Sequence, residues 1–78
     1  MANDVSHLLK MANDIANFCR PSNPGDFEAG AQATANHMRR FWYKTMREEF
    51  SQQASDLTNN LNDTARRAAY ILWEEINA

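Results

Sequence analysis

The sequence is poor in the residues that cross-link or interrupt a chain. It has one cysteine in 78 residues, Cys19, so no disulfide framework can form, and we expect a packed thiol in a reducing compartment. Both prolines and one of the two glycines fall in one stretch, PSNPGD, residues 21–26. That composition predicts a single loop there and leaves long uninterrupted segments on either side.

Long apolar runs are missing too. No stretch approaches the ~18 apolar residues that a membrane-spanning helix needs. The first residues, MANDVSHLLK, carry an acid where a signal peptide has positive charge. We therefore expect a cytoplasmic protein that does not enter a membrane.

Residue patterns that carry chemistry are equally scarce. His7 and His37 have no acidic residue at metal-ligand spacing nearby, and no glycine-rich phosphate loop is present. The adjacent glutamates at 48–49 and at 74–75 diverge on a helix, unlike a catalytic carboxylate pair. The sequence predicts no catalytic residue, no metal site and no cofactor, and hence a protein that is not an enzyme.

Positive charge is concentrated in one place. The net charge is −2, yet Arg39, Arg40, Lys44 and Arg47 occur within nine residues that contain no acid. Sequence-independent binding to nucleic acid depends on many phosphate contacts, so an acidic chain with one small basic patch is not expected to bind nucleic acid. Such a patch better suits an acidic protein surface.

The spacing of apolar residues is helical throughout and predicts an all-α fold, a small three-helix bundle formed by one domain over residues 1–78. The predicted helices cover about 4–19, 27–56 and 62–77, so that the central helix is long. Asn3, Asp26 and Asn62 stand where N-caps are expected, because their side chains can accept hydrogen bonds from free amides of the first turn.

The stripe that faces inward on each helix defines the expected core. Trp42 lies at the centre of the central helix's stripe, with Phe41 and Tyr43 about 100° to either side. Those two rings are expected either at the rim of the core or on display to a partner. In the last helix, Ile76 is expected to face inward. The principal core residues predicted are Leu8, Ile15, Met38, Trp42, Met46 and Leu72.

Two rows of residues remain on the outer faces. Their mixture of large aromatic and arginine side chains is typical of interface hot spots, although a solvated polar face is the alternative for the basic row. On the central helix the row is basic and edged by a tyrosine; on the last helix it carries two aromatic rings. The predicted partner-binding residues are Arg40, Tyr43, Lys44, Arg47, Arg66, Tyr70 and Trp73.

Two stretches, LLKMANDIANF and HMRRFWYKTMR, resemble the delta subunit of cytoplasmic, NAD-dependent, molybdenum-containing formate dehydrogenases. That family usually has a proline at the position of Lys44 and an arginine at that of Thr45, and without the proline a straighter second helix is expected. The matching residues are Met11, Ala12, Asn13, Ile15, Ala16 and Phe18 in the first block, and His37, Arg39, Arg40, Phe41, Trp42, Met46 and Arg47 in the second.

The resemblance implies a non-catalytic accessory subunit that carries no cofactor. Its implied partner is a larger molybdopterin-containing oxidoreductase subunit, which it binds and stabilises or helps to assemble. The alternative from the residues themselves is a free-standing helical interaction or regulatory module, possibly a homodimer that pairs its aromatic rows.

Overall fold

Four helices make up the computed structural model, which describes residues 5–22 and 24–78 of the chain. They are α1 (Ser6–Cys19), α2 (Phe27–Phe41), α3 (Lys44–Ser51) and α4 (Asp63–Ile76). Within the described ranges no strand occurs. The expected cap Asn3 and the expected first helical residue, Asp4, lie outside those ranges.

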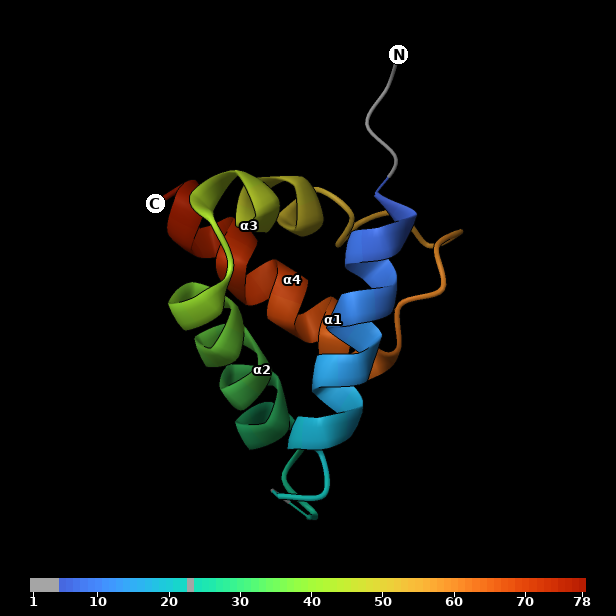
Figure 1. The fold of residues 1–78 in the computed structure, drawn as a ribbon. Helices are drawn as coiled ribbons and strands as arrows, with labels where there is room; N and C mark the ends of the chain where they lie inside the picture. The colour runs from blue at the N-terminus through green and yellow to red at the C-terminus, as the bar shows by residue number, and fades with distance from the viewer. Residues whose placement is uncertain (1–4, 23) are drawn as a thin grey trace.

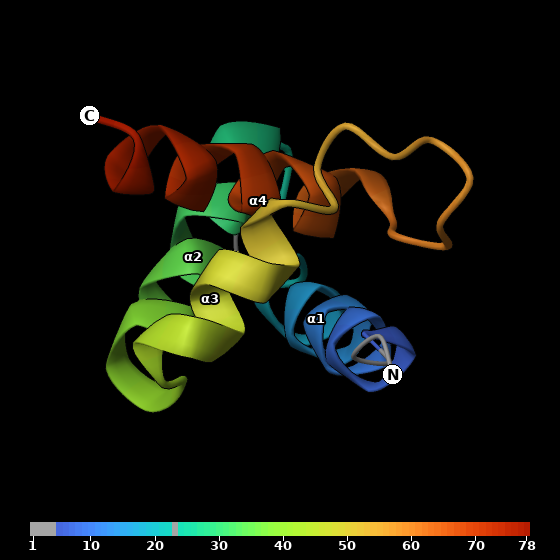
Figure 2. The same cartoon turned by 90° about the horizontal axis from the view of Figure 1, so that it is seen from above.

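Helices α1 and α2 form a hairpin whose connecting loop lies at one end of the molecule (Figure 1). Helix α4 crosses behind this hairpin, and α3 lies over α4 at the opposite end (Figures 1 and 2). Asp26 and Asn62 cap α2 and α4: their side chains accept hydrogen bonds from the amides of Ala29 at 2.9 Å and Ala65 at 2.8 Å. These caps explain why two helices begin where they do.

The long central helix predicted over residues 27–56 is wrong, because the chain turns sharply in its middle. Trp42 (φ −97°, ψ 144°) ends α2 and Tyr43 (φ −65°, ψ 155°) precedes α3, both in extended conformation. The expectation of a straighter helix without the family's proline is therefore also wrong. Tyr43 has the extended backbone that a residue before proline would adopt, although Lys44 follows it.

Packing explains this break. A continuous helix of 30 residues would be about 45 Å long, whereas its neighbours α1 and α4 have 14 residues each, or about 21 Å. The apolar stripe beyond Met38 would then face solvent. The two extended residues instead fold α3 back over α4, where the Trp42 ring meets Phe50 edge-on at 5.6 Å between centroids.

The core lies where the four helices meet. Leu8, Met38, Trp42 and Leu72 are buried, and Ile15 and Met46 are partly buried and pack against them. Phe50 is the largest fully buried side chain, a role that the helical wheel did not predict. In α4 the expectation for Ile76 is wrong: it is 40% exposed, and Ile71 is buried instead.

Ion pairs join α2 to α4 near both ends. Arg67 Nε donates to Glu28 Oε1 at 2.9 Å, and Arg39 Nε donates to Glu75 Oε1 at 3.0 Å. The hydrogen bond from Arg67 lowers the pKa of Glu28, and the one from Arg39 lowers the pKa of Glu75. Glu28 and Arg67 lie near the N-termini of α2 and α4, and Arg39 and Glu75 lie near their C-termini. The two helices therefore cross with their N-termini on the same side.

Residues 52–62, between α3 and α4, form a loop that lies beside α1 (Figure 1). Asn13 on α1 holds its far end: its Nδ2 donates to the Asn60 carbonyl at 2.8 Å, and its Oδ1 accepts from the Asn62 amide at 2.8 Å. Arg66 holds the near end. Its Nη1 donates to the carbonyls of Ala54 at 3.0 Å and Asp56 at 2.9 Å, and its Nη2 donates to Asn59 Oδ1 at 2.6 Å.

Replacing Arg66 by alanine should therefore destabilise the fold. Two carbonyls and a side-chain amide would lose a charged donor, at an expected cost of about 1.5–3 kcal/mol in the free energy of unfolding. Urea denaturation followed by circular dichroism measures this. Arg40→Ala is the matched control, since among the described residues the Arg40 guanidinium forms no hydrogen bond or ion pair and lies over the Phe41 ring; its expected effect is below about 0.5 kcal/mol. Equal destabilisation by both would contradict the assignment.

Candidate docking surface

The turn between α2 and α3, residues 40–44, displays two aromatic rings. Tyr43 is 80% exposed and Phe41 is 67% exposed, so neither ring lies at the rim of the core. The break in the helix causes this. The backbone becomes extended in order to bury Trp42, and side chains that alternate along an extended segment then direct the neighbouring rings outward. The Phe41 ring also contacts the His37 ring, with 4.8 Å between centroids and a tilt of 42° between the two planes.

Cations surround these rings. Arg40 lies over the Phe41 ring, 5.6 Å from its centroid. Among the described residues, Arg40, Lys44 and Arg47 form no ion pair, whereas Arg39 and Arg67 are both paired with glutamates. The basic cluster seen in the sequence is thus divided in two. Arg39 pairs α2 with α4, and the other three cations form no ion pair among the described residues.

Arg47 has one further feature. Its Nε is the one buried side-chain nitrogen or oxygen without a hydrogen-bond partner among the described residues. An unsatisfied buried donor costs roughly 1–3 kcal/mol. The positive charge of Arg47 also makes a small contribution to lowering the pKa of Glu75, after the larger effect of the Arg39 hydrogen bond.

The line along which α3 packs on α4, which we call the seam, is hollowed at three places. A hollow of about 350 Å³ lies between Lys44, Arg47 and Ile76. A second of about 430 Å³ is bounded by Ile76 and Trp73, and a third of about 290 Å³ by Trp73 and Tyr70. Shared residues connect each hollow to the next. The seam is therefore one continuous surface from the cations of α3 to the aromatic rings of α4.

The rings on α4 are half-exposed: Trp73 retains 42% and Tyr70 retains 40% of its accessible surface. The remaining predicted partner-binding residue, Arg66, differs from them. Its guanidinium donates three hydrogen bonds from α4 to residues of the loop between α3 and α4. We define the docking surface as Arg40, Phe41, Tyr43, Lys44, Arg47, Tyr70, Trp73 and Ile76.

Sequence reasoning missed Ile76 and the seam itself. The helical wheel placed the basic row and the aromatic row on separate helices with no stated relation between them. Only the reversal at residues 42–43 brings α3 onto α4 and makes the two rows neighbours. Position 44 could have indicated the break, because the proline usual in the family at this position is favoured at the first residue of a helix. This chain has Lys44 there, which gives no such indication.

The described ranges contain neither a metal site nor a membrane-spanning helix. No group of three or more His, Cys, Asp or Glu side chains there is placed to hold a metal ion. None of the described helices has the length and apolar character to cross a bilayer.

Fold and surface together define the class: a small all-α protein whose α3–α4 seam exposes aromatic rings and is lined by both cations and carboxylates. The chain belongs to the NADH-dependent formate dehydrogenase delta subunit family, FdsD, whose family model matches residues 7–69. Neither the curated proteins nor the solved structures contain a match to it.

Several residues that carry the family resemblance have structural roles. Ala12 and Ala16 are fully buried where α1 meets its neighbours. Asn13 ties the long loop to α1, Arg39 pairs with Glu75, and Trp42 fills the core at the break between α2 and α3. Several residues of the two sequence blocks therefore lie where one helix packs on another or binds a loop.

Proposed function

We propose that this chain is a non-catalytic accessory subunit that binds a larger molybdopterin-type oxidoreductase in a formate dehydrogenase-like complex and stabilises it or assists its assembly. Family membership supports the complex. The observation that carries the binding role is the docking surface, on which four large aromatic rings remain exposed beside three cations that form no ion pair among the described residues.

The chemistry of this surface indicates an acidic partner with apolar anchors. Arginine binds carboxylates through two parallel hydrogen bonds, and Arg40 and Arg47 both have free donors for that purpose. Exposed tryptophan and tyrosine lose little conformational freedom on binding and bury a large area. A partner that places carboxylates at the turn between α2 and α3, and aromatic side chains in the seam hollows, would match both the cations and the exposed rings.

The same charges disfavour the free-standing homodimer. In a two-fold dimer each surface residue meets the corresponding patch of the other copy. Pairing through the docking surface would bring Arg40, Lys44 and Arg47 close to their own copies, and like charges across an interface cost several kcal/mol. A heterologous acidic surface has no such cost.

Charge reversal at Lys44 tests the proposal. Lys44 is exposed in the first turn of α3, where glutamate suits the helix dipole, so Lys44→Glu should not destabilise the chain. We expect it to weaken association with the molybdopterin-containing subunit about tenfold or more, measured by biolayer interferometry after co-purification. Lys10→Glu is the matched control on α1, where the cation has only a 3.9 Å contact with Asp14; its expected change is within twofold.

Two outcomes would contradict the proposal. One is failure of the wild-type chain to co-purify with the large subunit when the two are expressed together. The other is equal loss of affinity in the Lys44 and Lys10 variants, which would mean that net charge alone governs binding. A tight homodimer in sedimentation experiments that the large subunit does not dissociate would favour the alternative module.

A further inference from the structure

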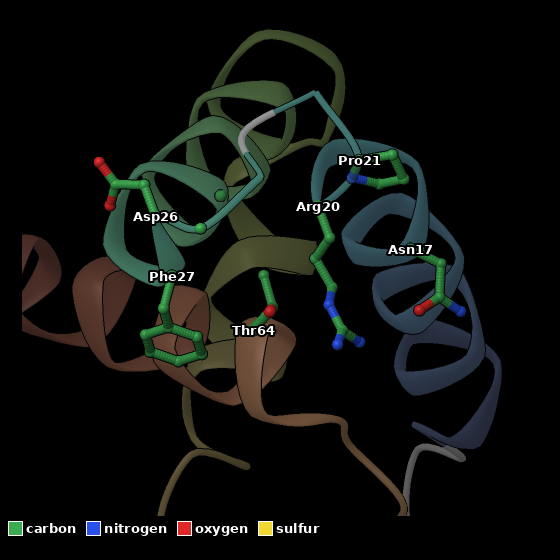
Figure 3. Close-up of a pocket in the computed structure, with 8 residues that line it drawn as sticks. Asn17, Arg20, Pro21, Asp26, Phe27 and Thr64 are labelled. Atoms are coloured by element: carbon green, nitrogen blue, oxygen red, sulfur yellow. The ribbon is translucent and has the colours of Figure 1, made fainter.

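A further hollow, separate from the three along the seam, lies at the other end of the bundle, where the end of α1, the loop before α2 and the start of α4 meet. Its volume is about 580 Å³. It is about 20 Å from the docking surface, because the 15 residues of α2 separate the two. Figure 3 shows the side chains around it. It is lined by Asn17, Arg20, Pro21, Gly25, Asp26, Phe27, Gly30 and Thr64.

Hydrogen-bond donors from two helix ends converge on this hollow. The Arg20 side chain extends between Thr64 and Asn17, as Figure 3 shows. Across residues 5–22 and 24–78, the Arg20 guanidinium has no hydrogen bond and no ion pair, although Arg39, Arg66 and Arg67 all do. The Asn17 Oδ1 accepts from Asn62 Nδ2 at 3.4 Å, which leaves the Asn17 amide hydrogens as donors.

Thr64 provides an independent indication of a ligand. Its side chain lines the hollow, and the residue is only 2% exposed. In the part of the chain that the structure describes, its hydroxyl makes no hydrogen bond, whereas the equally buried Thr34 hydroxyl donates to the Gly30 carbonyl at 2.8 Å. Arg47 Nε is the one described side-chain nitrogen or oxygen that is both closed to solvent and without a partner, so the Thr64 hydroxyl is accessible at the wall of the hollow and available to a ligand there.

The acidic side chain at the rim does not supply the missing acceptor. Asp26 uses its Oδ1 to cap α2 through the Ala29 amide at 2.9 Å. In Figure 3 its carboxylate points away from Arg20, Asn17 and Thr64. One wall is instead apolar: the Phe27 ring is 53% exposed and lies on the far side of Thr64 from Arg20. The hollow thus places an unpaired guanidinium next to an aromatic surface.

We propose that this hollow is a binding site for a carboxylate carried on an apolar group. The carboxylate would accept two parallel hydrogen bonds from Arg20 and further ones from the Thr64 hydroxyl and the Asn17 amide. The apolar group would lie against Phe27. Because the site and the docking surface are at opposite ends of α2, the two bind independently, and this site does not depend on the proposed function.

Phenylacetate is a suitable probe, because it joins a carboxylate to one aromatic ring. Titration of the full ¹⁵N-labelled chain should give saturable amide shifts at residues 17, 20, 27, 30 and 64. Phenylacetamide, which has the same shape without the charge, should bind at least tenfold more weakly. An acetylated dipeptide ending in a free phenylalanine carboxylate tests whether the ligand is a chain terminus: tighter binding than phenylacetate indicates a polypeptide, and equal binding indicates a small acid.

Two variants separate a binding role from a structural one. Arg20→Gln should weaken phenylacetate binding at least tenfold, while Arg40→Gln, an equal loss of charge on the docking surface, should leave it unchanged. Thr64→Val should weaken binding severalfold without lowering the midpoint of thermal unfolding, since the hydroxyl it removes has no partner in the described chain. Absence of saturable shifts, equal binding of the amide, or an unaffected Arg20→Gln variant would each overturn the proposal.

Discussion

Alanine at position 73 is expected to reduce affinity for the large subunit by about 30-fold or more, with little change in the stability of the isolated chain. Trp73 lies between two of the three seam hollows and is 42% exposed. A half-exposed tryptophan at the centre of a contact surface is a typical interface hot spot, and truncation of such a residue costs at least about 2 kcal/mol of binding. Because much of the ring already faces water, the chain itself loses little buried area.

Isothermal titration of the large subunit with wild-type and Trp73→Ala chains measures this loss. Leu57→Ala is the matched control: Leu57 is 81% exposed and lies in the loop after α3, outside the docking surface, so its replacement should change affinity less than twofold. Unchanged affinity in the Trp73 variant would remove α4 from the interface. Loss of affinity together with a large fall in thermal stability would show that the ring acts through the fold.

The second tryptophan should behave in the opposite way. Trp42 is only 7% exposed and packs edge-on against Phe50, at the point where the chain turns from α2 into α3. Trp42→Ala is expected to lower the free energy of unfolding by about 3–5 kcal/mol, because it removes buried aromatic surface and leaves a cavity. A domain of this length has roughly 4–12 kcal/mol of stability in total, so the variant would be close to unfolded at 37 °C.

Thermal denaturation followed by circular dichroism measures the effect, and Trp42→Phe is the control. Phenylalanine retains most of the apolar surface and the contact with Phe50, so we expect less than half of the loss. Saturating amounts of the large subunit should partly restore the folded state of the alanine variant, because ligand binding stabilises the folded form by mass action. A stability loss below about 1 kcal/mol would show that the turn between α2 and α3 forms without this ring.

The contrast between the two tryptophans also bears on how this small chain functions. Its core depends on side chains from all four helices, and many of the buried positions are alanines that add little apolar area each. Much of the larger apolar surface is instead left outside, on the docking surface. This distribution is consistent with a chain that gains stability from its partner, as the proposed accessory role requires.

Local sequence determined those features that depend on near neighbours. The helical class followed from the apolar spacing, and two helix starts followed from Asp26 and Asn62, because a cap is made within four residues. The family resemblance was also contained in the sequence, since its two blocks are contiguous. The prediction that some aromatic rings face outward was correct in kind, because three consecutive aromatic residues cannot share one face.

Tertiary structure decided what depends on distant partners. The chain turns at Trp42 because α1 and α4 are too short to cover a 30-residue helix, and the length of a neighbour is not a local property. The same turn made Ile76 part of a surface and joined the basic row to the aromatic row. Arg66 and Arg47 are both arginines on exposed rows, yet one fastens a loop and the other keeps an unsatisfied donor. The sequence thus specified the helices and their residues, and the packing of unequal helices decided which cations and rings remain available to another molecule.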